Sequence, residues 1–341
     1  MRFIKVIRME KCMLTRRRLL AVASALASAA STRADAQAGY PSGPIKMLVG
    51  YPAGGGVDIV ARLLGEPIQS ELGQSVVVEN RTGALATIAA GAVAKSVPDG
   101  QTLLMAASGE IAVNQHLYKD KLSYNALRDL IPVALVGIVP NVVVVGRDVP
   151  IKNPADLVAY AKQNPGKLSY STGGVGGPQH LAGELMNKMA GIDVLHVPYR
   201  GSAPAVTDVA TGAVTMSISS LAVALPLMDD GKIRAIAVTS KERMPQLPDV
   251  APLQEGTPGL KGYELLNWFG MFAPAGTPVP VLTRLNEISN RALSGDLLSN
   301  KLKAQGIVPK PMSLAEYKSF VEAETAKFGS IIADANIKLG N

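Results

Sequence analysis

Hydrophobic and polar positions along this chain follow two alternating periods, and each change of period marks the passage from a strand to a helix. Short apolar runs bounded by glycine or proline predict strands, whereas longer stretches with an apolar residue every third or fourth position predict amphipathic helices. Residues 59–72 form the clearest helical pattern, although Pro67 within it predicts a kink or a break. Asn153 followed by Pro154 predicts the N-cap and first turn of a helix that runs to about residue 163.

Most of the chain divides into alternating strands and helices in this way. Strands are expected at residues 45–51, 75–79, 103–107, 133–138, 141–145, 167–171, 194–197, 214–219, 233–239 and 265–273. Helices are expected at residues 59–72, 84–97, 153–163, 179–190, 202–212, 222–230, 281–294, 297–306 and 314–335. This alternation predicts an α/β architecture with parallel-rich sheets flanked by helices, in which ligands bind at the carboxyl ends of strands.

Two glycine-rich turns each follow an expected strand and lead into an expected helix. The first covers residues 53–58, with the sequence AGGGVD, and the second covers residues 172–178, with the sequence TGGVGGP. A strand, a glycine turn and a helix N-terminus expose unpaired backbone N–H groups at the positive end of a helix dipole, which favours an anion. Two such turns, more than 100 residues apart, predict two lobes that hold one anionic solute between them.

The first 38 residues have the composition of an export leader. A basic stretch at residues 15–20 overlaps an apolar, small-residue run at 19–30, and residues 34–36 or 36–38 offer an A-x-A cleavage site. The arginines fit the twin-arginine pattern loosely, and Met13 is an alternative start. An apolar run of 12 residues is too short to span a bilayer, which disfavours a membrane anchor. We therefore expect a cleaved signal peptide over residues 1–38 and a periplasmic protein.

Removing this leader changes the electrostatics of the chain. Residues 1–38 hold eight Lys and Arg against two acids, so a net +6 of the formal +7 belongs to the leader and about +1 is left for the mature chain. This balance removes the main support for nucleic-acid binding. The single cysteine, Cys12, lies in the leader, so the mature chain is predicted to have no disulfide, no thiolate nucleophile and no cysteine metal site.

Short motifs in a fixed order run through the chain from Tyr40 to its C-terminus. They are YPAGGGVD (51–58), VVENR (77–81), PDG (98–100), HLAGEL (180–185), HVPYRGSAPA (196–205), AVTS (237–240) and FAPAGTP (272–278). Together they make the chain resemble the Bug family, the extracytoplasmic solute receptors of tripartite tricarboxylate transporters. The resemblance implies a type II periplasmic binding protein, a monomer whose two lobes close over a small carboxylate. It further implies a large and a small membrane subunit as partners, and neither a cofactor nor a metal.

The same resemblance divides the mature chain into lobes and assigns a role to the glycine turns. Lobe I is expected to be discontinuous, with residues 39–141 and 265–341, and lobe II covers residues 142–264. The strands at 133–138, 141–145 and 265–273 are candidates to cross between the lobes. The two turns correspond to the carboxylate-holding strand–turn–helix elements of the family, one in each lobe.

A small carboxylate that enters a closed cleft loses strong hydration, so the site must return hydrogen bonds of comparable quality. Backbone N–H groups of the two turns can supply them, and nearby hydroxyl and carboxyl groups can add to them. The candidate ligand-binding residues are Ala53, Gly54, Gly55, Gly56, Val57, Asp58, Ser108, Glu110, Thr172, Gly174, Val175, Gly176, Gly177, Tyr199, Ser202 and Ser219. This set requires no Lys or Arg, so the predicted pocket is nearly neutral.

Several of these residues have a structural interpretation beside the functional one. Asp58 fits a helix cap as well as an acceptor for a ligand hydroxyl, amine or bridging water. His180 is interpreted as a structural hydrogen-bonding residue at a helix start, and His196 as structural. Tyr199 either fixes a loop or lines the cleft. Trp268 and its neighbour fit hinge or core packing better than a stacking platform.

The chain departs from the family pattern at positions that bear on ligand choice. Thr82 replaces a proline, and Glu110 stands where threonine is common. Val175 and Gly177 replace polar residues of the second turn, and Ser219 begins a Ser-Ser pair in place of Asp-Asn. Our hypothesis is a ligand different from acidic amino acids or citrate, such as a more apolar or aromatic monocarboxylate. Glu110 either pairs with a ligand amine or hydroxyl or points away.

Two other classes of protein are open at this point. An enzyme is disfavoured because the chain has no G-x-S-x-G, no H-E-x-x-H and no cysteine in the mature part, although a pair such as Asp58 and Glu110 is capable of acid–base work. A sensory receptor that presents a carboxylate to a signalling partner has the same sequence requirements as a transport receptor. A dinucleotide site is disfavoured because the first turn lacks the G-x-G-x-x-G spacing.

Overall fold

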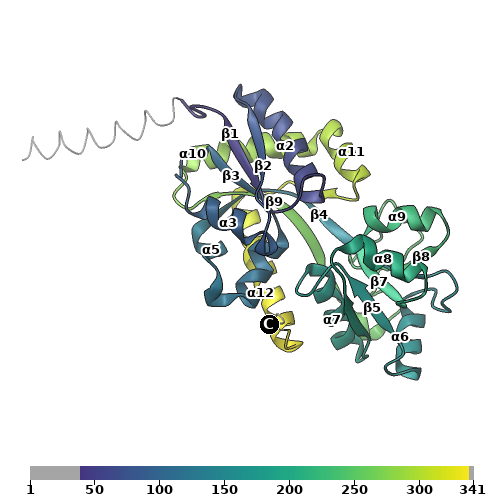
Figure 1. Ribbon diagram of the computed structural model, residues 1–341. Coiled ribbons are helices and arrows are strands. Elements are labelled where there is room, and N and C mark those ends of the chain that lie inside the picture. The colour runs from purple at the N-terminus through teal and green to yellow at the C-terminus, as the bar shows by residue number, and fades with distance from the viewer. Residues whose placement is uncertain (1–38, 338–341) are drawn as a thin grey trace, which may run out of the picture. The chain divides into compact units, whose positions relative to one another are not determined.

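The computed structural model of the chain describes residues 39–337, except for the side chain of Asp120. The signal peptide predicted over residues 1–38 lies outside the described residues. The described elements all belong to one compact unit that begins at Gly43 (Figure 1). None of its helices combines the length and the apolar character that a membrane span requires.

Ten strands of the described chain are joined by hydrogen bonds into one sheet. Their order is β2-β1-β3-β9-β4-β7-β5-β6, and β8 and β10 also pair with β4. The strands are β1 (Ile45–Val49), β2 (Val76–Asn80), β3 (Thr102–Ala107), β4 (Leu130–Gly146), β5 (Ser169–Thr172), β6 (Leu195–Pro198), β7 (Met216–Ser220), β8 (Ile233–Val238), β9 (Leu266–Pro274) and β10 (Val308–Pro309). Pairing is parallel at both ends of the order and antiparallel wherever β4 or β9 takes part. The sheet therefore has two parallel groups joined by β4 and β9.

The long strand β4 was expected as two strands, at residues 133–138 and 141–145, and that prediction is wrong. The structure has one strand of 17 residues that continues through Pro140. This proline stands at a change of neighbours, because β4 pairs with β9 as far as Pro140 and with β7 from Asn141 onward. A proline lacks the N–H that a continuous ladder needs, and here that gap falls where one ladder ends and the next begins.

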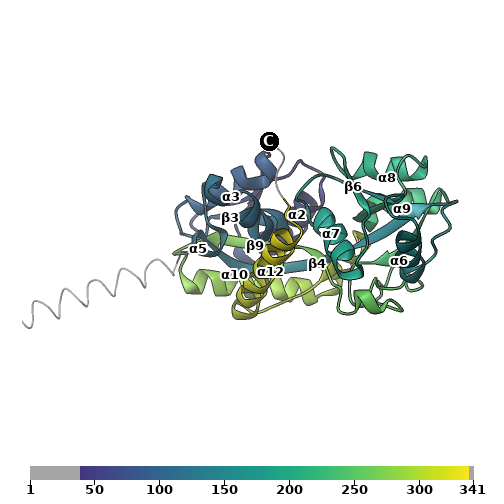
Figure 2. The same ribbon diagram turned by 90° about the horizontal axis from the view of Figure 1, so that it is seen from below.

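Helices cover the sheet on both sides (Figures 1 and 2). They are α2 (Gly56–Leu72), α3 (Thr87–Ala94), α4 (Asn114–Leu117), α5 (Ala126–Asp129), α6 (Pro154–Gln163), α7 (Pro178–Ala190), α8 (Ser202–Ala210), α9 (Leu221–Asp229), α10 (Val279–Ser294), α11 (Asp296–Ala304) and α12 (Leu314–Asp334). Four shorter turns are η1 (Ala84–Ala86), η2 (Gly109–Val113), η3 (Lys119–Lys121) and η4 (Pro258–Leu260). The predicted N-cap is confirmed, since the Asn153 side chain accepts a hydrogen bond from the Asp156 N–H.

The helix predicted at residues 59–72 starts three residues earlier and is not broken at Pro67. Val60, Leu64 and Ile68 are fully buried on the face of α2 that meets the sheet, whereas Pro67 is only half-buried. The packing of that apolar face outweighs the loss of one backbone hydrogen bond at Pro67.

The helix predicted at residues 84–97 is instead the short turn η1 followed by α3. Ala84, Leu85 and Ala86 have positive φ angles of 45°, 52° and 67°. Such left-handed backbone costs about 1–2 kcal/mol for each residue with a Cβ atom. The turn packs tightly on the end of β1, because a Cβ atom at Gly50 would lie 2.3 Å from the Ala86 Cβ.

The core is built on both faces of β4, whose residues are buried throughout most of its length. Val143 and Val145 face one apolar cluster, and Val142 and Val144 face another. Trp268 on β9 is fully buried against Phe272 and against Tyr317 of α12, which confirms its interpretation as core packing. Figure 2 shows α12 lying across β4 beside α7, and this C-terminal helix also contacts η2, which follows β3. The predicted α/β architecture is confirmed.

Candidate functional site

The first glycine turn joins β1 to α2 and is held by the buried carboxylate of Asp58. The Gly54 N–H donates to Asp58 Oδ2 over 2.9 Å, and Asn80 Nδ2 donates to Oδ1 over 2.9 Å. Arg62 donates to both oxygens, and its hydrogen bond lowers the pKa of Asp58 to about 2. Asp58 is 2% exposed. Its contacts to Gly54, Asn80 and Arg62 fit the structural role that was considered for it beside ligand binding. Its contact with a ligand stays a prediction.

The turn leaves unpaired backbone donors at the start of α2. Gly54 donates to Asp58, and Gly55 donates to the Pro52 carbonyl. Gly56 and Val57 are the first two residues of α2, and their N–H groups donate to no other residue of the described chain. A Cβ atom at Gly56 would lie 3.4 Å from the Phe269 ring, so this helix begins directly against β9. Ala53, by contrast, is exposed at the tip of the turn.

Ser108 and Glu110, which follow β3, are both fully buried. The Ser108 hydroxyl donates to Asn267 Oδ1 on β9 over 2.7 Å. The Glu110 carboxyl accepts hydrogen bonds from the Tyr51 hydroxyl over 2.8 Å and from the Ala107 N–H over 2.9 Å. Burial raises its pKa to about 7. Glu110 is therefore enclosed by protein groups, and its contact with a ligand stays a prediction.

The second glycine turn joins β5 to α7 and is held by side chains of α7 and β6. The Thr172 hydroxyl contacts Gly174 and lies 2.8 Å from His196 Nε2. The Gly176 N–H donates to His180 Nδ1 over 3.0 Å, and Gly177 is the extended N-cap of α7. Val175 is the exposed tip of the turn, at 37%. The structural interpretation of His180 as a hydrogen-bonding residue at a helix start is confirmed.

Tyr199 and Ser202 lie beside this second turn on the segment that leads into α8. The Tyr199 hydroxyl donates to Asp208 Oδ2 over 2.5 Å, a hydrogen bond that raises the pKa of the phenol. That bond fits the loop-fixing role rather than a hydroxyl in the cleft. The start of α8 lies against the turn, because a Cβ atom at Gly173 would stand 2.8 Å from Ser202 Oγ.

Two fully buried polar groups near the end of β7 have no partner in the described chain. They are the Asn141 Nδ2 and Ser219 Oγ atoms, while Asn141 Oδ1 accepts from Gln179 at the start of α7. Sequence reasoning chose Ser219 and missed Asn141. The available signal was an asparagine directly after Pro140 inside an otherwise apolar run. A buried donor without a partner costs about 1–3 kcal/mol, so both atoms call for a water or a ligand.

The central strands bring the two turns to one region of the sheet. Phe269 of β9, which lies against Gly56 at the start of α2, is paired in register with Gly137 of β4. Asn141, which contacts the start of α7 through Gln179, follows four positions later, or about 13 Å along the strand. The helix starts that carry the first and second turns therefore border the same stretch of β4 and β9. Asp58 is the only charged residue in either turn, so the exposed donors are neutral backbone groups.

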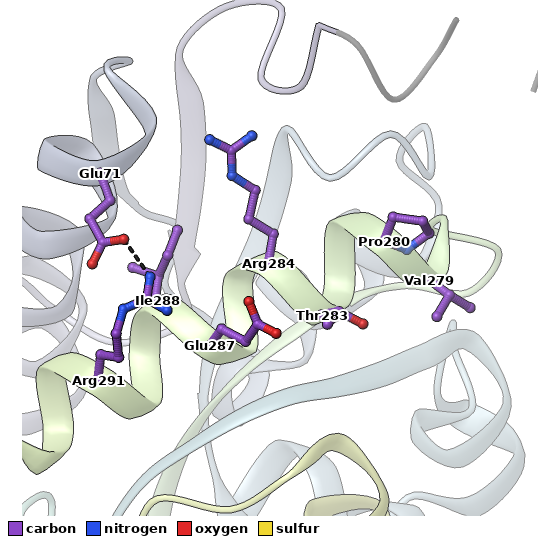
Figure 3. A pocket seen from close by; sticks show the side chains of 8 residues that line it. All are labelled: Glu71, Val279, Pro280, Thr283, Arg284, Glu287, Ile288 and Arg291. Carbon is purple, nitrogen blue, oxygen red and sulfur yellow. Dashed lines mark hydrogen bonds and ion pairs between the residues drawn. The ribbon is translucent and has the colours of Figure 1, made fainter. Parts of the chain in front are cut away.

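Elsewhere, the described residues form hollows at the surface, one of them along α2 and α10. No group of three or more His, Cys, Asp and Glu residues among them is arranged to hold a metal ion. A hollow of about 550 Å³ on the outside of α2 and α10 is lined by the Glu71–Arg291 ion pair and by Arg284 and Glu287 (Figure 3). Glu71 lies 15 residues beyond the start of α2, which places this hollow about 22 Å along the helix from the first turn.

Known proteins resemble this chain over most of its length. The family profile described as "Tripartite tricarboxylate transporter family receptor" matches residues 60–337. The chain is 38% identical over 319 residues to a UPF0065 protein of Pseudomonas sp. strain P51, covering 94% of each chain. It is 34% identical to the protein BugT of Bordetella pertussis, covering 94% of this chain and 98% of that one.

Solved structures of related proteins have the same fold. A Rhodopseudomonas palustris protein with adipate is 36% identical, with a TM-score of 0.77 over 88% of this chain and 99% of that one. MatC of the same organism with bound malate is 29% identical, with a TM-score of 0.72 over 86% and 99% of the two chains. The predicted two-lobed periplasmic binding fold is confirmed. The chain belongs to the family of tripartite tricarboxylate transporter receptors that includes the Bug proteins.

Proposed function

We propose that this protein is a periplasmic receptor that binds a small carboxylate between the two glycine turns. In this proposal the leader is removed on export, and the closed receptor delivers its solute to the large and small membrane subunits of a tripartite tricarboxylate-type transporter. Lobe I comprises residues 39–141 and 265–341, and lobe II comprises residues 142–264, with β4 and β9 as the connection. The protein acts by binding and carries out no reaction on the solute.

The observation that carries the proposal is the meeting of two helix starts on one stretch of β4 and β9. The N–H groups of Gly56 and Val57 from α2, and those at the start of α7, are suited to the oxygens of a carboxylate. Asn141 Nδ2 and Ser219 Oγ supply two further buried polar groups next to that stretch. The family relatives solved with adipate and malate support the ligand class, since both solutes are dicarboxylates.

A binding screen tests the proposal. The protein is exported, purified from the periplasm, unfolded in urea to release any bound solute and refolded. Thermal shifts and calorimetry are then measured with adipate, malate, citrate, glutamate, nicotinate and benzoate, with adipamide as the uncharged control. A ligand at a hundredfold excess over its Kd stabilises the folded state by about 2.7 kcal/mol. Binding of none of these acids would refute the proposed ligand class.

Two variants at Gly56 test whether the backbone donor at the start of α2 contributes. Gly56→Pro removes the N–H at the first helical position, where proline fits the helix, and Gly56→Ala adds the same Cβ atom but keeps the N–H. We expect Gly56→Pro to bind the preferred acid at least about tenfold more weakly than Gly56→Ala, as one charge-assisted hydrogen bond is lost. Equal affinities would show that this N–H does not hold the solute.

A further inference from the structure

The second glycine turn depends on an imidazole for the conformation of its buried glycine. Gly176 is buried with a φ of +78°, and its N–H donates to His180 Nδ1 over 3.0 Å. A backbone N–H can only donate, so Nδ1 must be the unprotonated nitrogen of the His180 ring. The ring proton is therefore on Nε2, which lies 3.7 Å from Glu184 Oε1. The turn is thus held by a neutral imidazole in one defined tautomer.

The imidazole of His196 stacks on that of His180 and contacts the start of the turn at Thr172. The rings of His180 and His196 are stacked, with centroids 3.9 Å apart and planes inclined by 17°. His196 Nε2 lies 2.8 Å from the Thr172 hydroxyl, which also contacts the backbone of Gly174. The two rings come from α7 and β6, and together they reach residues 172, 174 and 176 of the turn.

The surroundings of the two rings keep them neutral. Burial lowers the pKa of both His180 and His196 to about 4, and the neighbouring His180 ring further lowers the pKa of His196. The titratable groups that face them are Glu184 on α7 and Tyr170 on β5, and the Tyr170 hydroxyl donates to Glu184 Oε1 over 2.6 Å. Glu184 is thus held by Tyr170 and not closely paired with an imidazole. The stack shapes the turn without adding charge to the site.

We propose that His180 and His196 are positioning residues that hold the second glycine turn in the conformation that receives the solute carboxylate. They act through Gly176 and Thr172 and do not touch the solute. A turn that is already ordered binds without the entropy cost of being ordered by the ligand. The inference rests on the proposed function, because it assigns these residues to the same solute site.

Substitutions that separate ring packing from hydrogen bonding test this inference. His180→Phe keeps an aromatic ring for the stack but has no acceptor for the Gly176 N–H. His180→Asn places an amide oxygen close to the position of Nδ1 and keeps the acceptor. His196→Phe removes the contact to Thr172 and keeps the stack. His116→Phe is the matched control, since it removes an imidazole on α4 that contacts the Thr325 carbonyl of α12.

Two readouts are measured on each folded variant: the affinity for adipate and malate by calorimetry, and amide hydrogen exchange of Gly176. We expect His180→Phe to weaken binding about tenfold and to accelerate exchange at Gly176, because one hydrogen bond into the turn is lost. His180→Asn should remain within about threefold of the wild type in both readouts, which a loss of packing alone would not produce. His196→Phe should weaken binding as well, and His116→Phe should change neither readout.

The inference is overturned if His180→Phe binds and exchanges like the wild type, or if His180→Asn is as impaired as His180→Phe. Should the wild type bind neither acid, the proposed ligands are wrong. Hydrogen exchange at Gly176 still decides in that case whether the imidazole positions the turn, so the two failures are distinguishable.

Discussion

Replacing Glu110 with glutamine should stabilise the protein at alkaline pH and leave its stability at acidic pH nearly unchanged. The Glu110 carboxyl has no exposed surface, and burial raises its pKa from the ordinary 4.5 to about 7. Glutamine has the same shape and cannot ionise. Its amide oxygen can accept from the Ala107 N–H, and its amide nitrogen can donate to the Tyr51 oxygen, as a protonated carboxyl would.

The sign and size of the effect follow from proton linkage. The folded protein holds the Glu110 proton up to about pH 7, whereas the unfolded chain releases it near pH 4.5. The contribution of Glu110 to the free energy of unfolding is therefore full below pH 4.5, declines as the pH rises to about 7, and stays low above that. Each pKa unit corresponds to about 1.36 kcal/mol, so the upper bound on the loss is about 3 kcal/mol at pH 8.

Urea unfolding followed by circular dichroism at pH 5, 6.5 and 8 measures this difference. Glu110→Gln should match the wild type within about 1 kcal/mol at pH 5 and exceed it by about 2–3 kcal/mol at pH 8. Glu66→Gln, which changes an exposed carboxylate on α2, is the control and should follow the wild type at every pH. A difference between Glu110→Gln and the wild type that is the same at pH 5 and pH 8 would refute the buried, titrating carboxyl.

Three other substitutions test the backbone strain at Leu85, the carboxylate of Asp58 and the hydroxyl of Ser219. Leu85→Gly should raise the free energy of unfolding by about 1 kcal/mol in urea, because it relieves a φ of 52° at a half-exposed side chain; a loss of stability would contradict the strained backbone. Asp58→Asn should cost up to about 2 kcal/mol at pH 7 and little at pH 2, since the carboxylate stabilises the folded state above its ordinary pKa of 3.8 and loses this effect as the pH falls through about 2. Equal losses at both pH values would argue against that role. Ser219→Ala should leave the melting temperature of the solute-free protein unchanged or higher, because an unpartnered buried hydroxyl is removed, and should weaken carboxylate binding by calorimetry. Unchanged affinity would place Ser219 outside the site.

Local patterns in the chain were sufficient for most strands and helices near the two glycine turns. Strands β1 and β5 and helices α2 and α7 were expected within a few residues of their observed bounds, because apolar periodicity and glycine turns act over short stretches of chain. The continuous strand β4 was missed, since Pro140 is a strand breaker by local rules and is tolerated only where two ladders meet. The uninterrupted α2 was missed for a similar reason, because the packing of its buried face overrides Pro67.

The sequence by itself determined that this chain has two strand–glycine–helix elements, an almost neutral net charge beyond residue 38 and the motif order of a solute receptor family. These properties depend on residue type and on spacing over a few positions. Only the tertiary structure decided what individual side chains do. Asp58 accepts a hydrogen bond from the Gly54 N–H, and buried Glu110 accepts one from the Tyr51 hydroxyl. The His180 ring stacks on His196, and the Asn141 side-chain amide has an unpaired donor. Most of these relations depend on which elements pack together and which way a side chain turns, and burial then raises the pKa of Glu110 and lowers that of His180.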